Sequence, residues 1–460
     1  MMTTSNLALF VLMLFIAGSY GWAVRGTTLG KETGAMLPGA LLGILCAWFS
    51  GSALLWENFW IFCAAGALGM FVGGTETYGE TIGLVTGAKP PPEPVRGYMG
   101  LALKGLLWFG IAGAFLGLAF TAVTGSVYTV RDFIWLFAPM PFLWALGVAA
   151  FNRPHRPKEG KLPKIYFSKT RVEVWGGMAA MLLSLLVFLL VKGDRFALFL
   201  CAGGAIGGAI GWALGIWLFQ LSLYPLRNGK YLFGTLRTKG MIDGWKIMEN
   251  TLGAVGFLGI GAGFVLGYPL LQERIAALER IGTLWNPLGE RQELLSWGML
   301  LLITVGEALL GGVYLLWLKK TKYGDAYLSA VHKSLYTYLS LPLVYLGAVR
   351  YARLVSVFLI YLPLVIKMMG GNKRKSSLAY KMPIALSLVA LLLAEIFWGE
   401  RFTVLYPWIL YTLVYFGFEF LRTLPPGKEK KKPRSSLITV EGFKAAGIIA
   451  LWIFACEYFW

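Results

Sequence analysis

Long apolar runs separated by short polar connectors recur along the whole chain. The runs are about 16 to 24 residues long, and a helix needs about 20 apolar residues to cross a bilayer. No stretch between them is long and polar enough to fold as a separate soluble domain. The pattern therefore predicts an all-α, polytopic integral membrane helix bundle of about 14 transmembrane helices, which we place at residues 7–24, 34–50, 58–74, 98–120, 133–151, 172–191, 196–219, 250–271, 295–318, 335–349, 354–369, 382–398, 403–421 and 442–460.

The composition fits a membrane protein better than a soluble one. Of the 460 residues, 57% are hydrophobic and 14% are charged, whereas a soluble protein carries about 25% charged residues. The net charge of +19 would also suit a nucleic-acid-binding protein. Nearly all Lys and Arg residues, however, lie in the short connectors, where they set the orientation of the helices. We therefore predict no nucleic-acid partner.

The basic residues predict which side of the membrane each connector faces. With the N-terminus outside, the connectors on the cytoplasmic side hold 31 Lys and Arg residues against 9 on the outside. Cytoplasmic connectors carry such an excess because translocating positive side chains is disfavoured. The apolar stretch 335–369 lies between two basic connectors, so it must form two crossings with a tight turn near Arg350. We predict a multi-pass protein of the plasma (cytoplasmic) membrane with both termini outside.

Two connectors have a composition of their own. Residues 272–294 place Ile275, Leu278 and Ile281 at helical spacing beside Glu and Arg side chains. This fits either a short helix on the membrane surface or a solvated loop. The Pro- and Lys-rich segment 423–440 predicts a flexible linker. Membrane lipids are the expected surroundings, and anionic lipids are expected to contact the basic cytoplasmic connectors.

Cysteine and histidine residues predict neither a disulfide framework nor a metal site. The four cysteines all fall inside apolar runs without a CxxC pair, and no Cys or Asp cluster surrounds either histidine. No cofactor is therefore expected. The N-terminus has no positive region ahead of its first apolar run, so we expect residues 7–24 to be a retained helix rather than a cleaved signal peptide.

Matching glycine patterns predict an internal repeat. Residues 63–69 read CAAGALG and residues 201–207 read CAGGAIG, and Gly73 matches Gly211 at the same offset. Each copy would contain four crossings, and an even number indicates a parallel repeat. We divide the chain accordingly into a first helix with its connector, two repeat units and a group of C-terminal helices, at residues 1–33, 34–151, 172–318 and 335–460.

The same glycines predict close helix packing whether or not the chain is duplicated. In lipid, small residues four positions apart let two helix backbones approach each other. Two such stripes are prominent, at Gly207, Gly211 and Gly215, and at Gly259, Gly263 and Gly267. We expect both stripes to face neighbouring helices.

An acidic residue in the middle of an apolar run is the first candidate for chemistry. Glu307 lies near the centre of the helix 295–318, in the sequence LLITVGEALLGG. An ionisable group there costs about 2.5–3.5 kcal/mol on insertion scales. Two interpretations fit: a carboxyl that loads and releases an ion during function, or a hydrogen-bonded Glu that ties two helices together.

Further candidates lie in the polar, Gly-rich stretch 73–87. Glu76 and Glu80 are four residues apart, as are Thr77 and Thr81, so each pair is expected to share one helical face. Two like charges at this spacing disfavour a helix. A cation is therefore expected opposite them.

The connector 25–34, on the same side of the membrane, can supply that cation. It carries Arg25, Lys31 and Glu32 among glycines and threonines. Together with stretch 73–87 it resembles chain that interrupts helices around a cavity. Such chain would line a polar vestibule or an anion-binding mouth; ordinary solvated helix ends are the alternative. Lys104, inside the predicted helix 98–120, is expected to extend its ammonium to the membrane interface.

The leading functional hypothesis is a transporter or flippase for a small or lipid-like substrate. Many helices, short connectors and acidic groups in and beside the bundle favour it, and Glu307 would couple transport to protons or sodium. Two alternatives stay open: a membrane-embedded enzyme acting on lipid-linked substrates, and a non-catalytic subunit of a membrane complex. The enzyme is disfavoured because the four Asp residues form no recognisable catalytic pair.

Overall fold

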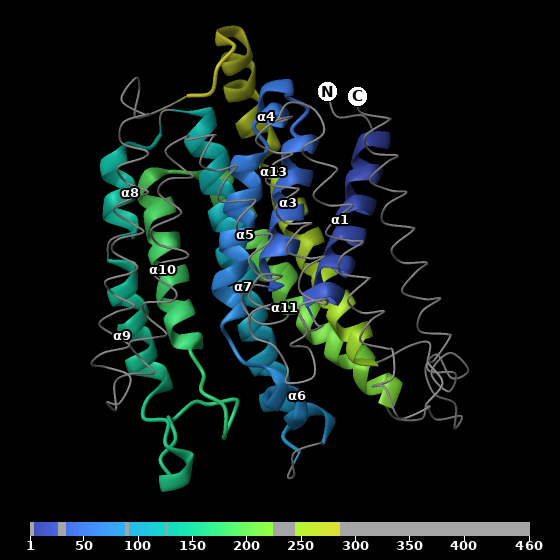
Figure 1. The fold of residues 1–460 in the computed structure, drawn as a ribbon, viewed down its shortest axis with the longest axis vertical. Helices are drawn as coiled ribbons and strands as arrows, with labels where there is room; N and C mark the ends of the chain where they lie inside the picture. The colour runs from blue at the N-terminus through green and yellow to red at the C-terminus, as the bar shows by residue number, and fades with distance from the viewer. Residues whose placement is uncertain are drawn as a thin grey trace, which may run out of the picture. The chain divides into compact units, whose positions relative to one another are not determined.

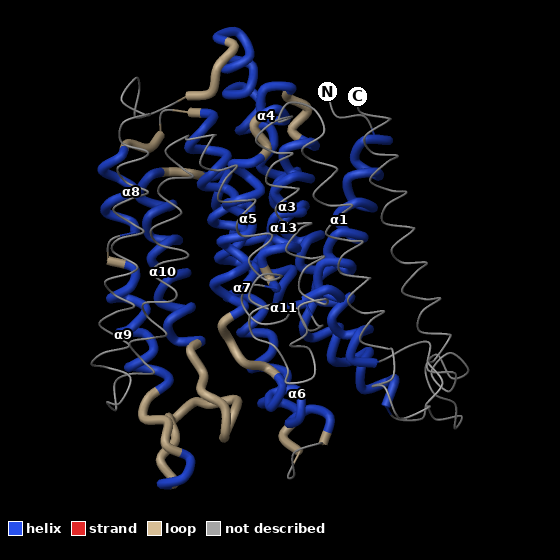
Figure 2. The backbone as a smooth tube through the Cα atoms, viewed as in Figure 1, coloured by secondary structure: helices blue, strands red, loops and turns tan. Residues whose placement is uncertain are grey.

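A computed structural model of the chain describes residues 4–25, 34–87, 92–125, 127–137, 139–223 and 244–285. By its contacts the chain divides into two compact units, and all described residues lie in the first, which comprises Met1–Leu223 and Gly244–Pro363. In the described ranges the regular structure is helical (Figure 1). Figure 2 shows these helices joined by loops, without a strand among them.

Eight predicted helices fall in the described ranges, and the structure is helical at each of these places. The elements are α1 (Thr4–Arg25), α3 (Met36–Phe49), α4 (Ala53–Glu57), α5 (Trp60–Gly74), α6 (Gly79–Thr86), α7 (Pro94–Thr124), α8 (Val130–Phe137), α9 (Met140–Asn152), the 3-10 helix η1 (Pro157–Glu159), α10 (Trp175–Lys192), α11 (Arg195–Leu223) and α13 (Gly244–Ile281). The remaining predicted helices, from 295–318 onward, lie outside the described residues.

Several of these helices have the length and apolar character of membrane spans. Three shorter apolar helices lie in α1, α3 and α5. Five stretches are long and apolar enough to cross a membrane, namely Pro94–Thr124, Arg131–Asn152, Trp175–Lys192, Arg195–Leu223 and Gly244–Ile281. The described part of the chain is thus an all-helical bundle compatible with a membrane protein.

Two predicted helices have different bounds in the structure. The stretch 133–151 is split, because α8 ends at Phe137 and α9 begins at Met140, beside Pro139, which has no N–H to donate. The helix predicted to end at residue 271 instead continues through Pro269 to Ile281. Residues 272–281 are therefore helical, as the spacing predicts, but they are the end of one continuous helix rather than a separate surface helix or a solvated loop; residues 286–294 of this connector lie outside the described residues.

Six helices pack in succession around a common centre, in the order α1, α3, α5, α7, α11 and α13, and α13 returns to α1. Glycine makes each of the six contacts so close that an added Cβ would lie within 3 Å of the facing helix. Backbones can approach this far only where the side chain is a hydrogen atom. The contacts are Gly21 with Pro38, Gly39 with Gly66, Gly69 with Ala112, Gly105 with Gly208, Gly203 with Gly259, and Gly253 with Gly18.

Aromatic side chains from several of these helices meet in the centre. Trp22 of α1 lies 5.2 Å from the Trp108 ring and 5.0 Å from the Phe109 ring, both of α7. Closer to the other end, Phe10 stacks on Phe49 at 3.8 Å. Large buried rings supply much of the packing energy of such a core, so the six helices hold one another through both glycine contacts and aromatic packing.

Helices α8, α9 and α10 lie beside α7, outside the six-helix group (Figure 1). Gly147 of α9 and Gly176 of α10 bring this pair together, since an added Cβ at Gly147 would lie 2.2 Å from Gly176 O. Trp135, Phe142 and Leu190 remain exposed on these helices. Exposed apolar side chains of this kind suit a lipid-facing surface.

Successive crossings run in alternate directions, so the connectors gather at two ends (Figure 1). We call the end that holds α6 and the α9–α10 connector the α6 end. The opposite end, which holds α4 and the α10–α11 turn, is the α4 end. The polar residues singled out in stretch 73–87 lie at the α6 end.

Candidate functional site

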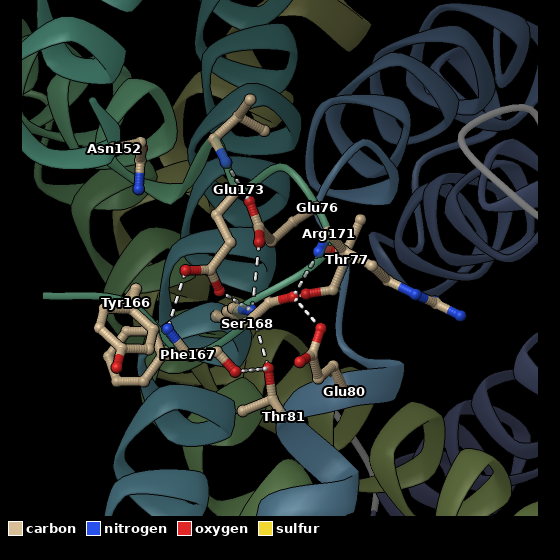
Figure 3. Close-up of polar contacts among 12 residues, drawn as sticks. Glu76, Thr77, Glu80, Thr81, Asn152, Tyr166, Phe167, Ser168, Arg171 and Glu173 are labelled. Atoms are coloured by element: carbon tan, nitrogen blue, oxygen red, sulfur yellow. Dashed lines mark hydrogen bonds and ion pairs between the residues drawn. The ribbon is translucent and has the colours of Figure 1, made fainter. Parts of the chain in front are cut away.

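The connector between α9 and α10 folds back against the bundle at the α6 end, and we call its residues 163–174 the docking loop (Figure 3). Its Phe167 ring packs over Gly100 of α7, where an added Cβ would lie 2.4 Å from Phe167 Cδ1. Arg96 donates from Nε to Tyr166 O at 2.8 Å, and its guanidinium lies 3.8 Å above the Tyr166 ring. The loop is therefore held as closely as a part of the core.

Lys104 of α7 lies at the centre of a buried charged cluster, which we define as Lys104, Glu76 and Glu173. Its Nζ is 2.7 Å from Glu173 Oε1 and 3.2 Å from Glu76 Oε1. Nζ also donates to Thr77 O at 2.6 Å and to Thr81 Oγ1 at 3.0 Å. All three charged side chains are 2% exposed, so they interact with one another rather than with water.

The same groups fasten the docking loop to α5, α6 and α7. Glu173 folds back so that its Oε2 accepts from Phe167 N at 2.8 Å. Glu76 Oε2 accepts from Val174 N at 2.8 Å. Thr81 Oγ1 donates to Phe167 O at 3.2 Å. Each acidic group thus satisfies a backbone N–H that would otherwise be buried without a partner.

Glu80 of α6 binds the docking loop in a different way. Its Oε2 accepts from Ser168 Oγ at 2.6 Å, from Thr170 N at 3.0 Å and from Thr170 Oγ1 at 2.8 Å (Figure 3). Burial raises the pKa of a carboxyl, but here the donated hydrogen bonds outweigh it and lower the pKa of Glu80 to about 2. Glu80 is therefore ionised at neutral pH.

The helical structure is interrupted between the two Glu residues of stretch 73–87. Helix α5 ends at Gly74, and α6 begins only at Gly79. Thr75 Oγ1 donates back to Val72 O at 2.8 Å, which completes the last turn of α5. The prediction that Glu76 and Glu80 share one helical face was therefore wrong. The break lets Glu76 turn toward α7 while Glu80 reaches the docking loop.

The structure brings together four of the predicted site residues. Glu76, Thr77, Glu80 and Thr81 all contact the docking loop, and Thr77 Oγ1 donates to Val172 O at 3.3 Å. Lys31, Glu32 and Glu307 lie outside the described residues. Arg25 ends α1, and its side chain is likewise not described.

Among the described residues, Lys104 is the cation paired with Glu76, and the expectation that connector 25–34 supplies a cation falls on side chains outside the described residues. The expectation that Lys104 extends to the membrane interface was wrong, because its side chain is buried and fully hydrogen-bonded. Glu173 was missed as a site residue. The signal that could have found it is an acidic side chain at the start of an apolar run, since such a group needs a partner.

A comparison of the chain with protein-family models, curated proteins and solved structures finds no match. Inference about function therefore rests on the geometry of the charged cluster. In the described ranges no group of His, Cys, Asp and Glu side chains is placed to hold a metal ion. In the structure the carboxylates of the cluster pair with Lys104 and accept hydrogen bonds from the docking loop, so a change in their charge would change how the loop is held.

A second buried acid, at the α4 end, has a purely structural arrangement. Asp194 precedes α11, and its Oδ1 accepts from Ala197 N and from Thr121 Oγ1, each at 3.1 Å. Its Oδ2 accepts from Tyr128 Oη. A carboxylate that accepts from the first turn of a helix is a stabilising N-cap. Both carboxylate oxygens have donors, which is not true of Glu76.

Proposed function

We propose that this chain is a multi-pass membrane transporter or flippase for a small or lipid-like substrate, coupled to an ion that binds at the charged cluster. One observation carries the proposal: an ammonium and two carboxylates from three segments are buried together beside a broken helix. Ionisable groups within a membrane domain are expensive, and they commonly mark the paths of ions or substrates. Interrupted helices with polar backbone are common at transporter binding sites.

A non-catalytic subunit of a membrane complex is the second candidate. The aromatic centre of the six-helix group favours it, because Trp22, Trp108 and Phe109 fill the space between helices. In that case the charged cluster would only fasten the docking loop. The two proposals differ in one respect: a transporter must change the ion occupancy of the cluster during its cycle, whereas a scaffold need not.

The proposal includes an overall arrangement of the whole chain. We infer about 14 crossings of the plasma membrane, with both termini outside and the α6 end in the cytoplasm, where basic connectors contact anionic lipids. The glycine patterns support a parallel repeat of residues 34–151 and 172–318. The substrate would pass between these units, and Glu307 is a second candidate for coupling.

Reconstitution into vesicles tests the function. We expect movement of fluorescent phospholipids or of labelled solutes that depends on a proton or sodium gradient across the vesicle membrane. Glu173→Gln removes one charge of the cluster at nearly constant shape and should slow this movement at least about tenfold, the effect of about 1.4 kcal/mol on a barrier. Lys192→Met serves as the control, since Lys192 pairs with Asp132 at 2.6 Å outside the cluster.

The outcome separates the candidates. Gradient-driven movement that is lost in Glu173→Gln and kept in Lys192→Met supports transport through the cluster. Absence of lipid and solute movement under every gradient, from protein that is folded and correctly inserted, would contradict the transporter and favour the subunit. Stoichiometric co-purification of a partner would then be expected.

A further inference from the structure

Lys104 has no N–H group left for Glu76. An ammonium carries three N–H donors and no acceptor. One of those of Lys104 points to Glu173 Oε1 at 2.7 Å. The other two point to Thr77 O at 2.6 Å and to Thr81 Oγ1 at 3.0 Å. Glu76 Oε1 lies 3.2 Å from Nζ and accepts no hydrogen bond.

The negative charge of the Glu76 carboxylate is poorly stabilised at Oε1, because no hydrogen-bond donor reaches this oxygen. The side chain is 2% exposed, so water does not replace the missing donor. Its other oxygen, Oε2, accepts from Val174 N at 2.8 Å. A buried acceptor without a donor is destabilising, and a proton on the Glu76 carboxyl would leave Glu173 as the one carboxylate of the cluster paired with Lys104.

The other charged groups around the cluster do not neutralise it. Arg96 donates to Glu93 and to Tyr166 O, and Arg153 donates to Asn152 O. Arg171 of the docking loop is exposed, and Glu80 of α6 binds the same loop through Ser168 and Thr170. Among the described residues, Lys104 is the one cation within ion-pair distance of Glu76. Two carboxylates therefore share one ammonium.

We propose that Glu76 is the proton-binding group of the cluster and that its carboxyl holds a proton in the arrangement seen here (Figure 3). This inference rests on the proposed transport function and names the coupling ion as a proton. Protonation converts the Glu76 carboxylate into a carboxylic acid and changes the net charge of the three groups from −1 to 0. In a coupled cycle, Glu76 takes the proton from water on one side of the membrane and releases it to water on the other.

The electrostatic surroundings agree with the geometry. Burial raises the pKa of Glu76, and although Lys104 opposes the rise, the Glu173 carboxylate adds to it. Glu80, four residues away, has the opposite character, because three donated hydrogen bonds stabilise its ionised form. The two carboxyls bind the same loop but differ in the number of donors that reach them.

Infrared difference spectroscopy on the full-length protein in lipid nanodiscs tests the proposal. A protonated buried carboxyl has its own C=O stretching band, which shifts in D₂O. We expect the wild type to keep such a band at pH values well above the ordinary glutamate pKa of about 4.3. Glu76→Gln should abolish the band, and Glu159→Gln, at an exposed glutamate of η1, should leave it unchanged.

A second variant keeps the test decisive if Glu76→Gln does not fold. Removing the competing negative charge in Glu173→Gln lets Glu76 ionise against Lys104, so the band should disappear at a lower pH than in the wild type. A wild-type protein without the band, or a band unaffected by Glu76→Gln and Glu173→Gln, would overturn the proposal. A band that sodium chloride abolishes at constant pH would assign the site to a metal cation instead and would also overturn it.

The result is independent of the vesicle assay. If the band behaves as expected and the vesicles move neither lipid nor solute, the proton site stands and the transport proposal fails. If the vesicles transport but the band is absent, transport stands and a proton on Glu76 is refuted.

Discussion

Two glutamates four residues apart bind the same loop in different protonation states, and the number of nearby donors explains the difference. Three donated hydrogen bonds converge on one oxygen of Glu80. Glu76 has one backbone donor and shares Lys104 with Glu173. A carboxylate with several donors is stabilised in its ionised form, whereas a buried carboxylate that lacks them gains by binding a proton.

Glu80→Gln should therefore loosen the docking loop. We expect a loss of about 1–3 kcal/mol at neutral pH, since hydrogen bonds to a charged acceptor contribute about this much. The pKa of Glu80 is lowered from 4.5 to about 2, so its contribution is present above pH 4.5 and is lost as the pH falls toward 2. Thermal unfolding of wild type and variant in detergent across this range measures both effects.

The control for this experiment is Glu93→Gln. Glu93 pairs with Arg96 at 3.0 Å but is 31% exposed, and partly exposed pairs contribute only about 0–1 kcal/mol. An acid-dependent loss of stability that is the same in Glu80→Gln as in the wild type would mean that the Glu80 carboxylate does not hold the loop.

Two of the three residues of the charged cluster could be recognised from the sequence. Spacing identified Glu76, and an ammonium inside an apolar run drew attention to Lys104. Glu173 could not be recognised as their partner, because it lies 69 residues from Lys104 in sequence and reaches it only when the docking loop folds back. Whether a lysine in a helix extends to the interface or pairs depends on a carboxylate within reach, which is a property of the tertiary structure.

At the scale of helices, glycine spacing was the most reliable signal. The predicted stripes on α11 and α13 do face neighbouring helices: an added Cβ at Gly207 would lie 2.8 Å from Gly259 Cα, and one at Gly263 would lie 2.2 Å from Phe199 O. Spacing identifies such a face because residues four apart share one side of a helix. It does not identify the partner helix, nor the continuation of α13 through Pro269, which tertiary packing permits.

Two alanine substitutions on α7 separate packing from helix propensity. Alanine favours a helix over glycine by about 1 kcal/mol, so a loosely packed site should gain stability. At Gly105 an added Cβ would lie 2.2 Å from Gly208 O, and the backbone of α11 cannot yield as a side chain can. At Gly110 the nearest atoms are side-chain carbons of Ala205 and Leu182 at 3.3 Å.

We expect Gly105→Ala to destabilise the protein by about 1–3 kcal/mol or more, as overpacking does, and Gly110→Ala to have a small effect of either sign. Thermal unfolding of the two purified variants measures the difference. Equal stability of the two would show that α7 and α11 are not in close backbone contact at Gly105.

At the scale of the whole molecule, the alternation of helices places connectors at two ends, and the charge distribution predicts which end is which. Glu57 in α4 is exposed at the α4 end, and Glu159 in η1 is exposed at the α6 end. The excess of basic residues in connectors such as the one between α9 and α10 predicts that the α6 end faces the cytoplasm. Charge can assign a side because it acts during insertion, independently of how the helices later pack.

Single-cysteine labelling of intact cells tests this orientation. Three native cysteines, Cys46, Cys63 and Cys201, are buried and outside any disulfide, so their labelling background should be low once Cys456 is replaced. A membrane-impermeant maleimide should label Glu57→Cys from outside and should label Glu159→Cys only after the cells are permeabilised. The reverse pattern would invert the assignment of the α6 end, and labelling of both positions from one side would contradict the alternation of the helices itself.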